Sequence, residues 1–416
     1  MRIKIRKKYL FYALAFASAI VAAINSGVDA TVSENFITDA WALGLAIFLI
    51  GIPVTLVFAS IFSIKIGKKT IGQKYVDPSF KKFRLIRKEE VKYQFLAGLG
   101  NALYTVGYFA LFEQAGGDPS VVLPFAQVVI LYLVLIESVN EKDMPTLPEL
   151  QSIIIVTFGA ILGSLSLTGN INPLSLLLVF LIINPGWVLL TVYQRKLKWL
   201  RIDGRHNDSI NIRFWNVITA TILTVVMILF YDLFTGGNHF INGLYAIINH
   251  IGWVTLIAIG AFFAFIFYIR ALGIGKASIA QAVRSTTIIF AVPVSLLIAH
   301  LGVIEQFPLD PTLLLIKIIG IVIMVLGIAS FALTLVKAYI FVKLKPGYDI
   351  EETMQKMWKI RGISRVCVVA GKYDVIIKVR TRTLVKGYEK IIRKLGEIDA
   401  VDEYKWESVL KEWEDI

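Results

Sequence analysis

The sequence predicts a polytopic α-helical membrane protein with ten transmembrane helices, followed by a C-terminal α+β domain. Three observations support this fold class. The chain of 416 residues is 56% hydrophobic and only 18% charged, whereas soluble domains carry about a quarter charged residues. Its lysines and arginines are concentrated in alternate loops between apolar segments. After residue 337, the long apolar segments are replaced by short segments in which apolar and polar residues alternate.

Ten apolar segments have the length of a membrane span, for which about 20 apolar residues are needed. They are 9–27, 41–64, 94–112, 119–137, 150–168, 173–193, 212–234, 251–270, 279–301 and 313–336. The first of them, with the basic residues before it, also resembles a signal peptide. We expect it to be retained, because ten spans fit the distribution of loop charge and nine do not.

The loop charges predict the orientation. The N-terminal segment 2–8 and the loops 65–93 and 195–205 are rich in Lys and Arg. Five other loops contain neither residue: 28–40, 113–118, 169–172, 235–250 and 302–312. Basic loops remain in the cytoplasm. We therefore expect both termini in the cytoplasm of a multi-pass plasma-membrane protein. The net charge of +13 is assigned to contact with the lipid bilayer rather than with nucleic acid.

The apolar region contains two segments with a similar order of features. ALFEQAGGDPSVVLPFAQVVILYLVLIE is followed by LQSIIIVTFGAILGSLS, and RALGIGKASIAQAVRSTTIIFAVPVSLLIAHLGVIE by IIGIVIMVLGIASFA. Both resemble a unit of the drug/metabolite transporter superfamily. The resemblance covers most of residues 1–336 and implies a ten-helix transporter domain made of two inverted five-helix repeats, a common transporter design.

Residues 338–416 have the pattern of a small soluble domain. The expected elements are a strand in AYIFVKLKPG, a helix in DIEETMQKMWKI, strands in SRVCVVA and YDVIIKVR, a helix in TLVKGYEKIIRKLGEI and a strand in VDEYKWESVLKE. Asp349 suits the N-cap of the first helix, whose apolar stripe includes Trp358. The pair Gly371-Lys372 predicts a hairpin turn. The order βαββαβ is that of a ferredoxin-like fold.

Three stretches of this domain resemble the effector-binding domain of the Lrp/AsnC family. They are KPG (345–347), GISRVCVVAGKYDVIIKVRT (362–381) and IDAVDEYKWESVL (398–410). The resemblance implies a homodimer formed through the sheets and an amino-acid effector bound near Gly371, Tyr373 and Asp374. No nucleic-acid partner is expected, because apolar spans replace the helix-turn-helix domain of that family. An ACT domain is the alternative, and Gly and Asp also suit a turn that binds no ligand.

Polar side chains inside the apolar spans mark the predicted transport cavity, because polar groups in a membrane face a cavity or the bundle interior. The candidates are Asn101, Tyr104, Tyr108, Gln127, Asn184, Gln281, Arg284 and Ser285. Asn184 precedes Pro185-Gly186, which either opens the helix for a substrate or only bends it for packing. Arg284 either extends back to the cytoplasmic surface or pairs with a substrate carboxylate. No Asp or Glu is expected in the middle of a span.

The sequence predicts no enzymatic activity, metal site or cofactor. The four histidines lack ligand spacing, and Cys367 is the single cysteine. The segment RALGIGKAS lacks the Gly and the Ser/Thr of a phosphate-binding loop at Arg270 and Ala277. We therefore expect a secondary transporter, and specifically an exporter, of amino acids or related small-molecule substrates, regulated by its C-terminal domain. The alternatives are an amino-acid receptor that does not transport and a lipid-type carrier.

Overall fold

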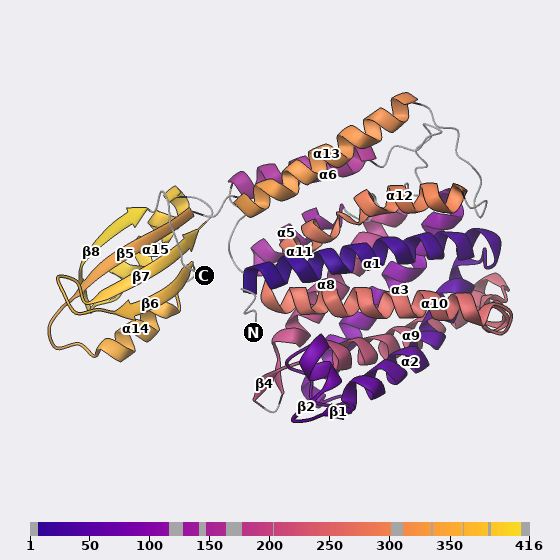
Figure 1. The fold of residues 1–416 in the computed structure, drawn as a ribbon, viewed down its shortest axis with the longest axis horizontal. Helices are drawn as coiled ribbons and strands as arrows, with labels where there is room; N and C mark the ends of the chain where they lie inside the picture. Colours follow the sequence, from indigo (N-terminus) through magenta and orange to yellow (C-terminus); the bar gives the residue numbers. More distant parts are fainter. Residues whose placement is uncertain are drawn as a thin grey trace. The chain divides into compact units, whose positions relative to one another are not determined.

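The computed structural model divides the chain into two compact units. It describes residues 7–115, 128–140, 147–163, 177–202, 204–300, 311–333, 336–360, 362–381 and 384–408. One unit comprises Met1–Asp143 and Ile155–Val325, and the other comprises Met144–Ile154 and Leu326–Ile416. The first is helical, and the second contains the C-terminal sheet (Figure 1).

The helices of the N-terminal region follow the predicted apolar segments only in part. In the first half they are α1 (Lys7–Asn35), α2 (Ala40–Ser63), α3 (Lys88–Ala115), α5 (Val129–Asn140) and α6 (Leu147–Gly163). In the second half they are the π-helix η2 (Val179–Ile183), α8 (Asn184–Trp199), α9 (Ser209–Thr235), α10 (His239–Ile274), α11 (Ala277–Arg284), α12 (Thr287–His300) and α13 (Pro311–Leu333).

The prediction of ten membrane helices in two inverted five-helix repeats is wrong. Within the described residues, four helices are long and apolar enough to cross a membrane: Tyr9–Asn35, Ala40–Ser63, Ser209–Thr235 and His239–Ile274. The difference has a physical cause, which is that apolar composition does not reveal where a helix is interrupted. The predicted span 279–301 is divided between α11 and α12, while α5 and α6 have only 12 and 17 residues. Conversely, α10 continues through the predicted loop 235–250, with non-helical backbone at His250.

The helices α3 and α8 approach each other at two glycines. A Cβ atom at Gly186 would lie 2.8 Å from the backbone N of Tyr104 and 3.0 Å from the carbonyl O of Gly100. Such distances leave no room for a methyl group, because all these atoms belong to the backbone. Gly186 therefore permits close helix packing. The alternative that Asn184-Pro185-Gly186 bends the helix for packing agrees with this contact.

The two basic loops each fold into a short hairpin. The strands β1 (Lys65–Ile66) and β2 (Lys69–Thr70) follow α2, and β3 (Arg201–Ile202) and β4 (Arg205–His206) follow α8. Gly67 and Gly204 occupy the turns with φ of +66° and +75°, a conformation that favours glycine. The π-helix η1 (Gly72–Val76) follows the first hairpin.

A buried network of charged and polar side chains connects these loops. The Nζ atom of Lys198, at the end of α8, donates to Oδ2 of Asp77 and to the carbonyl O of Asn207, both at 2.6 Å. The same Oδ2 accepts from the backbone N and the hydroxyl of Ser209 at 2.8 Å. Hydrogen bonds of this kind are what make a buried ion pair tolerable. The loop after α2 is thereby attached to the end of α8 and the start of α9.

The Asp77 carboxylate of this pair is charged at neutral pH. Burial raises the pKa of Asp77, but the charge and hydrogen bond of Lys198, with backbone hydrogen bonds from Ser209 and Ser79, outweigh burial and lower the pKa to about 2. An aspartate in an unfolded chain has a pKa of about 3.9. Because the folded value is the lower one, this carboxylate contributes its full stabilisation above about pH 4 and loses it as the pH falls towards about 2.

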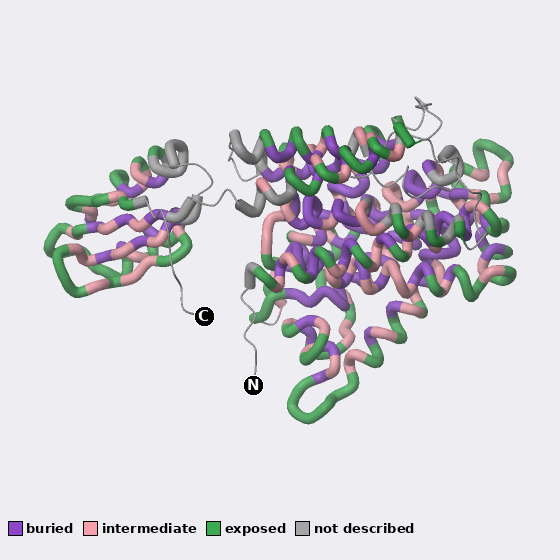
Figure 2. The backbone as a smooth tube through the Cα atoms, turned by 45° about the horizontal axis from the view of Figure 1, so that its top comes forward, coloured by how far each residue is buried: buried purple, intermediate pink, exposed green. Residues whose placement is uncertain are grey.

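The C-terminal unit contains a four-stranded antiparallel sheet with two helices, and its elements follow the predicted order βαββαβ. They are β5 (Val336–Leu344), α14 (Ile350–Trp358), β6 (Ile363–Val368), β7 (Val375–Thr381), α15 (Leu384–Gly396) and β8 (Val401–Ser408). The strand order is β6-β7-β5-β8. Ile340, Val342 and Ile377 pack with Met357 and Leu395 in a common core, and buried positions are visible along the strands in Figure 2.

Two local predictions for this unit need correction. The hairpin between β6 and β7 begins after Val368 and ends at Val375, so its loop is longer than the predicted two-residue turn. Trp358 is 58% exposed, whereas Thr353 and Met357 form the buried face of α14. The side chain of Asp349 caps α14 as predicted, by accepting from the backbone N of Glu351 at 2.7 Å.

Substitution of Gly186 by Ala should destabilise the protein, because the added methyl group overlaps the backbone of α3. We expect a loss of about 1–3 kcal/mol in the free energy of unfolding, as for other overpacked positions. Thermal unfolding of the purified chain in detergent measures the loss. Gly252→Ala is the matched control, since nothing lies within 4 Å of a Cβ atom there. Equal melting temperatures for the two variants would contradict the packing role.

Substitution of Lys198 by Met should leave the Asp77 carboxylate buried without its cation. We expect a loss of about 3–5 kcal/mol, the usual cost of breaking a buried pair. The double variant Lys198→Met/Asp77→Asn removes the uncompensated charge and should recover part of the stability in the same unfolding assay. If the double variant is no more stable than Lys198→Met, the ion pair is not the source of the loss.

Candidate functional site

Polar side chains of α1, α3, α9, α11 and α12 meet around a cavity of about 90 Å³ in the helical region. We call it the central cavity. Its polar lining consists of Asn25, Asp29, Asn101, Tyr104, Thr105, Tyr108, Arg213, Gln281, Arg284 and Thr287. Aromatic rings of Phe48, Phe109, Trp187 and Phe265 complete the wall. Charged groups around an apolar cavity are costly to bury, and such clusters commonly mark binding sites.

Two arginines present incompletely paired guanidinium groups at the central cavity. Arg213 is 5% exposed, and among the described residues nothing accepts a hydrogen bond from its Nε or Nη1 atom. The same holds for Nε of Arg284. Their guanidinium carbons lie over aromatic rings, 4.2 Å from the centre of Phe265 and 4.4 Å from that of Trp187. Cation–π contact offsets part of the desolvation cost, and an anion in the cavity would supply the remaining acceptors.

A buried carboxylate lies in the same cavity. Asp29 is 6% exposed, and Nδ2 of Asn25 donates to its two carboxylate oxygens at 3.2 and 3.3 Å. The sequence predicts no acid in the middle of a span. Asp29 lies in the predicted loop 28–40, but it belongs to α1, which continues to Asn35, past the predicted end at residue 27. The pair Asn25 and Asp29, spaced four residues apart on one helix face, was the available signal.

Five of the predicted cavity residues line the central cavity. They are Asn101, Tyr104, Tyr108, Gln281 and Arg284. Arg284 faces the cavity, over Trp187 and also 5.3 Å from the centre of the Tyr268 ring, rather than extending away to the surface. The shared helix face of the three α3 residues explains their common direction.

The other three predicted residues are not among those lining the cavity. Asn184 is fully buried, and its amide has no hydrogen-bond partner among the described residues. Ser285 donates to the carbonyl O of Ala282 at 2.5 Å, a local bond at the end of α11. Gln127 lies outside the described residues.

Hydrogen bonds between neighbouring helices fix the orientation of the lining groups. Trp187 Nε1 and the Tyr268 hydroxyl donate to Oε1 of Gln281 at 3.0 and 3.1 Å. Ser26 and Tyr108 share a hydrogen bond of 2.5 Å between their hydroxyls. The lining is therefore ordered before any ligand binds, which reduces the cost of binding.

Glu137, at the end of α5, holds the helix that carries Gln281 and Arg284. Its carboxylate accepts from the backbone N of Ala277 at 2.8 Å and from the hydroxyl of Ser278 at 2.5 Å. It also pairs with Nη1 of Arg195 at 2.5 Å. The Glu137 carboxylate thus lies at the N-terminus of α11, where the backbone N–H groups of a helix lack partners within the helix.

In the C-terminal unit, Asp374 connects the hairpin loop to β5. Its Oδ2 accepts from the backbone N of Leu344 at 2.7 Å, and its own N donates to the carbonyl O of Val342 at 3.0 Å. The Tyr373 ring lies 5.6 Å from that of Phe341. Gly371 is exposed and has no atom within 4 Å of a Cβ position. The loop therefore has a structural anchor at Asp374 and open space at Gly371.

Comparison with known families supports the assignment of this unit. Residues 337–415 match the family described as "Lrp/AsnC ligand binding domain". The C-terminal unit is an Lrp/AsnC ligand-binding domain. Domains of this type bind small effectors and often dimerise. The match does not extend into residues 1–336, so the resemblance of that region to the drug/metabolite transporter superfamily gains no support from it.

Two other comparisons add little. A search of curated proteins finds no match to this chain. A solved structure described as "Crystal structure of protein" aligns with 78% of this chain and 96% of its own, at 14% sequence identity and a TM-score of 0.46. We draw no conclusion about the fold or the function from a likeness at that level.

Proposed function

We propose that the helical region transports amino acids or related zwitterionic metabolites across the plasma membrane, and that the Lrp/AsnC domain regulates this transport. The observation that carries the proposal is the central cavity, whose lining includes the buried Asp29 and two arginines with N–H groups that have no hydrogen-bond acceptor among the described residues. No enzymatic step, metal or cofactor is part of the proposal.

The charges of the central cavity are complementary to those of an amino acid. A guanidinium group binds a carboxylate through charge-assisted hydrogen bonds, which are available at Arg213 and Arg284. An ammonium group requires an acceptor, and Asp29 supplies a carboxylate on the same cavity. The rings of Trp187 and Phe265 offer apolar contact for a side chain. A purely anionic substrate would leave Asp29 unmatched and is disfavoured.

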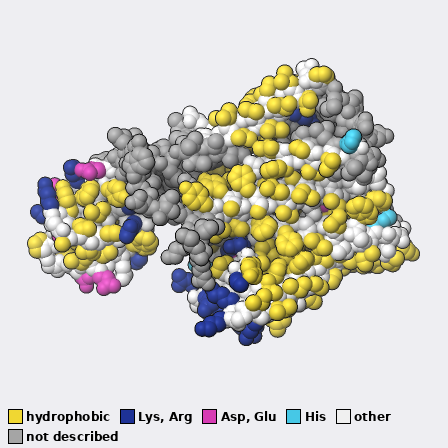
Figure 3. Space-filling view, in the orientation of Figure 1, with side chains coloured by type: hydrophobic (Ala, Val, Ile, Leu, Met, Phe, Trp, Pro, Cys, Tyr) yellow, Lys and Arg dark blue, Asp and Glu magenta, His cyan; other side chains and the backbone are white. Residues whose placement is uncertain are grey.

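The surface of the helical region supports a location in a membrane. Large apolar side chains are exposed along α9, with Leu233 at 77% and Phe234 at 82%. Figure 3 shows hydrophobic side chains over most of the visible helical surface. Exposed apolar area of this extent is expected for contact with lipid. We propose that the basic hairpins mark the cytoplasmic end of the helices and that both termini are cytoplasmic.

Regulation by the C-terminal domain has support from the chain connection. Helix α13 ends at Leu333 and β5 begins at Val336. A connection this short leaves little slack, so a change in the domain should be transmitted to α13. A carrier that responds to a cytoplasmic amino acid is most useful as an exporter of that amino acid, which is the direction we propose.

The sheet of the domain also supports homodimer formation. Ile340, Val342 and Ile377 face the helices, and the alternation of a strand places Phe341 and Ile376 on the opposite face. These two side chains remain only partly buried. A second copy of the sheet would cover them.

A membrane-anchored receptor is the second candidate function. It is favoured by the position of the family match, which covers the effector domain and leaves the helices without an assigned activity. In this alternative the helices anchor the domain and the central cavity carries no solute.

Replacement of Arg213 or Arg284 by Met should lower amino-acid flux in proteoliposomes about tenfold or more, because each variant loses charge-assisted hydrogen bonds. The measurement is uptake and counterflow of labelled amino acids by the full chain. Lys356→Met, an exposed lysine of α14, is the control. Undiminished flux in both arginine variants would contradict the cavity assignment. Absence of flux for all amino acids, with effector binding intact, would favour the receptor.

Substitutions at Asp374 should separate effector binding from loop structure. Asp374→Asn keeps an oxygen acceptor for the backbone N of Leu344, whereas Asp374→Ala removes it. We expect calorimetry of the full chain with the twenty amino acids to find one or more effectors, and Asp374→Asn to weaken them about tenfold through loss of a charged partner. If only Asp374→Ala weakens binding, the carboxylate serves the loop and not the effector.

A further inference from the structure

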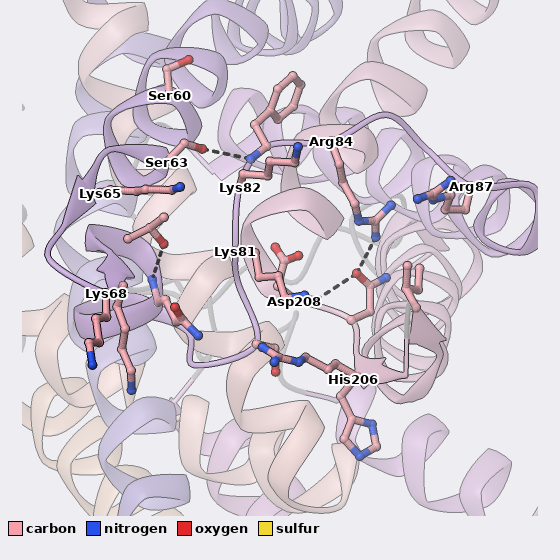
Figure 4. Close-up of a pocket in the computed structure, with 18 residues that line it drawn as sticks. Ser60, Ser63, Lys65, Lys68, Lys81, Lys82, Arg84, Arg87, His206 and Asp208 are labelled. Atoms are coloured by element: carbon pink, nitrogen blue, oxygen red, sulfur yellow. Dashed lines mark hydrogen bonds between the residues drawn. The ribbon is translucent and has the colours of Figure 1, made fainter.

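A second and much larger cavity lies between the two basic loops of the helical region. Its volume is about 990 Å³, within the range of small-molecule sites. We call it the basic cavity. Its cationic lining includes Lys65, Lys68, Lys69, Lys81, Lys82 and Arg205. Figure 4 shows how several of these side chains surround the opening, and Figure 3 shows Lys and Arg gathered near β1, β2 and β4.

The charge of the basic cavity is strongly one-sided. Among the described residues, Asp208 is the only acid in its lining, and its carboxylate already accepts from the backbone N and the side-chain amide of Asn211 at 2.8 and 2.9 Å. Among the described residues, no acid forms an ion pair with Lys65, Lys68 or Lys82. Clustered like charges repel one another and raise the local concentration of anions.

The wall of the basic cavity is held by partly buried hydrogen bonds. Arg84 forms a bidentate pair with Glu90, at 2.6 and 2.8 Å, and donates to Oδ1 of Asn207 at 2.8 Å. The backbone N of Phe83 donates to the hydroxyl of Ser63 at 2.9 Å. The segment that carries Lys81 and Lys82 is thus attached to the end of α2 and to the loop before α9, so the cations are positioned in advance.

The tendency of cytoplasmic loops to be basic does not explain this arrangement. That tendency accounts for lysines and arginines near the membrane surface, but it does not require them to line a common cavity. Here two loops that are more than a hundred residues apart in the chain are joined by the Lys198–Asp77 pair and enclose a common cavity. Hydroxyls of Ser60 and Thr70 lie in the same wall and can donate to an oxyanion.

We propose that the basic cavity binds an anionic ligand through its phosphate group. The ligand is either the headgroup of an anionic phospholipid or a soluble organic phosphate, since the lysines and hydroxyls recognise the phosphate oxygens that both share. Occupation of the basic cavity would neutralise repulsion between the hairpins and stabilise the ends of α2, α3, α8 and α9. The proposal does not depend on transport by the central cavity.

The test compares two triple variants of the full chain in nanodiscs. Lys68→Gln/Lys69→Gln/Lys82→Gln removes three charges from the basic cavity. Lys343→Gln/Lys356→Gln/Lys405→Gln removes three exposed charges from the C-terminal domain and is the control with the same net charge. The soluble probe is pyrophosphate, titrated in nanodiscs of phosphatidylcholine alone. The lipid probe is phosphatidylglycerol, measured by its retention through purification and by native mass spectrometry.

If the ligand is a soluble phosphate, pyrophosphate should bind saturably to the parent, and added salt should weaken this binding. The affinity should fall about tenfold or more in the cavity variant and stay unchanged in the control variant. A lipid ligand predicts retention of phosphatidylglycerol by the parent and by the control but not by the cavity variant, without binding of pyrophosphate. Either pattern supports the proposal. If the two triple variants behave alike towards both probes, the basic cavity is no phosphate site and the proposal is overturned. The outcome of this binding test does not bear on the amino-acid flux assay, which tests the central cavity separately.

Discussion

The buried ion pair between Lys198 and Asp77 connects more of this protein than any other described contact. It joins the loop after α2 to the last turn of α8 and the first residues of α9. Arg213 of the central cavity lies on α9, one turn after Ser209, and Trp187 lies on α8. The basic cavity is formed by the same two loops. Both cavities therefore involve elements that this ion pair joins. Its burial is tolerable because Asp77 also accepts from Ser209 and Lys198 also donates to the carbonyl O of Asn207.

The sequence was most informative where local patterning and tertiary structure agree. The alternation of the strands and the N-cap at Asp349 predicted the order of elements in the C-terminal domain, because a half-buried strand must alternate and a helix start needs an acceptor. In the helical region, the spacing of Asn101, Tyr104 and Tyr108 predicted a shared direction, since it is fixed by the helix period. Their common cavity with Gln281 and Arg284 follows from the same rule applied to α11.

The failures also have physical causes. A count of apolar segments assumes that each forms one straight helix, but the break between Arg284 and Thr287 depends on tertiary contacts that composition does not reveal. A 20-residue window ended the first helix before Asp29, although α1 continues and buries it. Lys317, a cation within the apolar helix α13, is only 5% exposed. Long-range partners decide the position of such residues, and no local pattern encodes them.

The hydrogen bonds that Glu137 accepts from α11 bear on access to the central cavity. Helix α11 has eight residues, too few to persist without tertiary support. Its first residues are held by one carboxylate, which Arg195 also contacts. Freeing this short wall costs only a few charge-assisted hydrogen bonds, far less than separating the long helices around it. Under the proposed transport function, a path for a solute would therefore open by local unfolding of this short helix, with the rest of the bundle left in place.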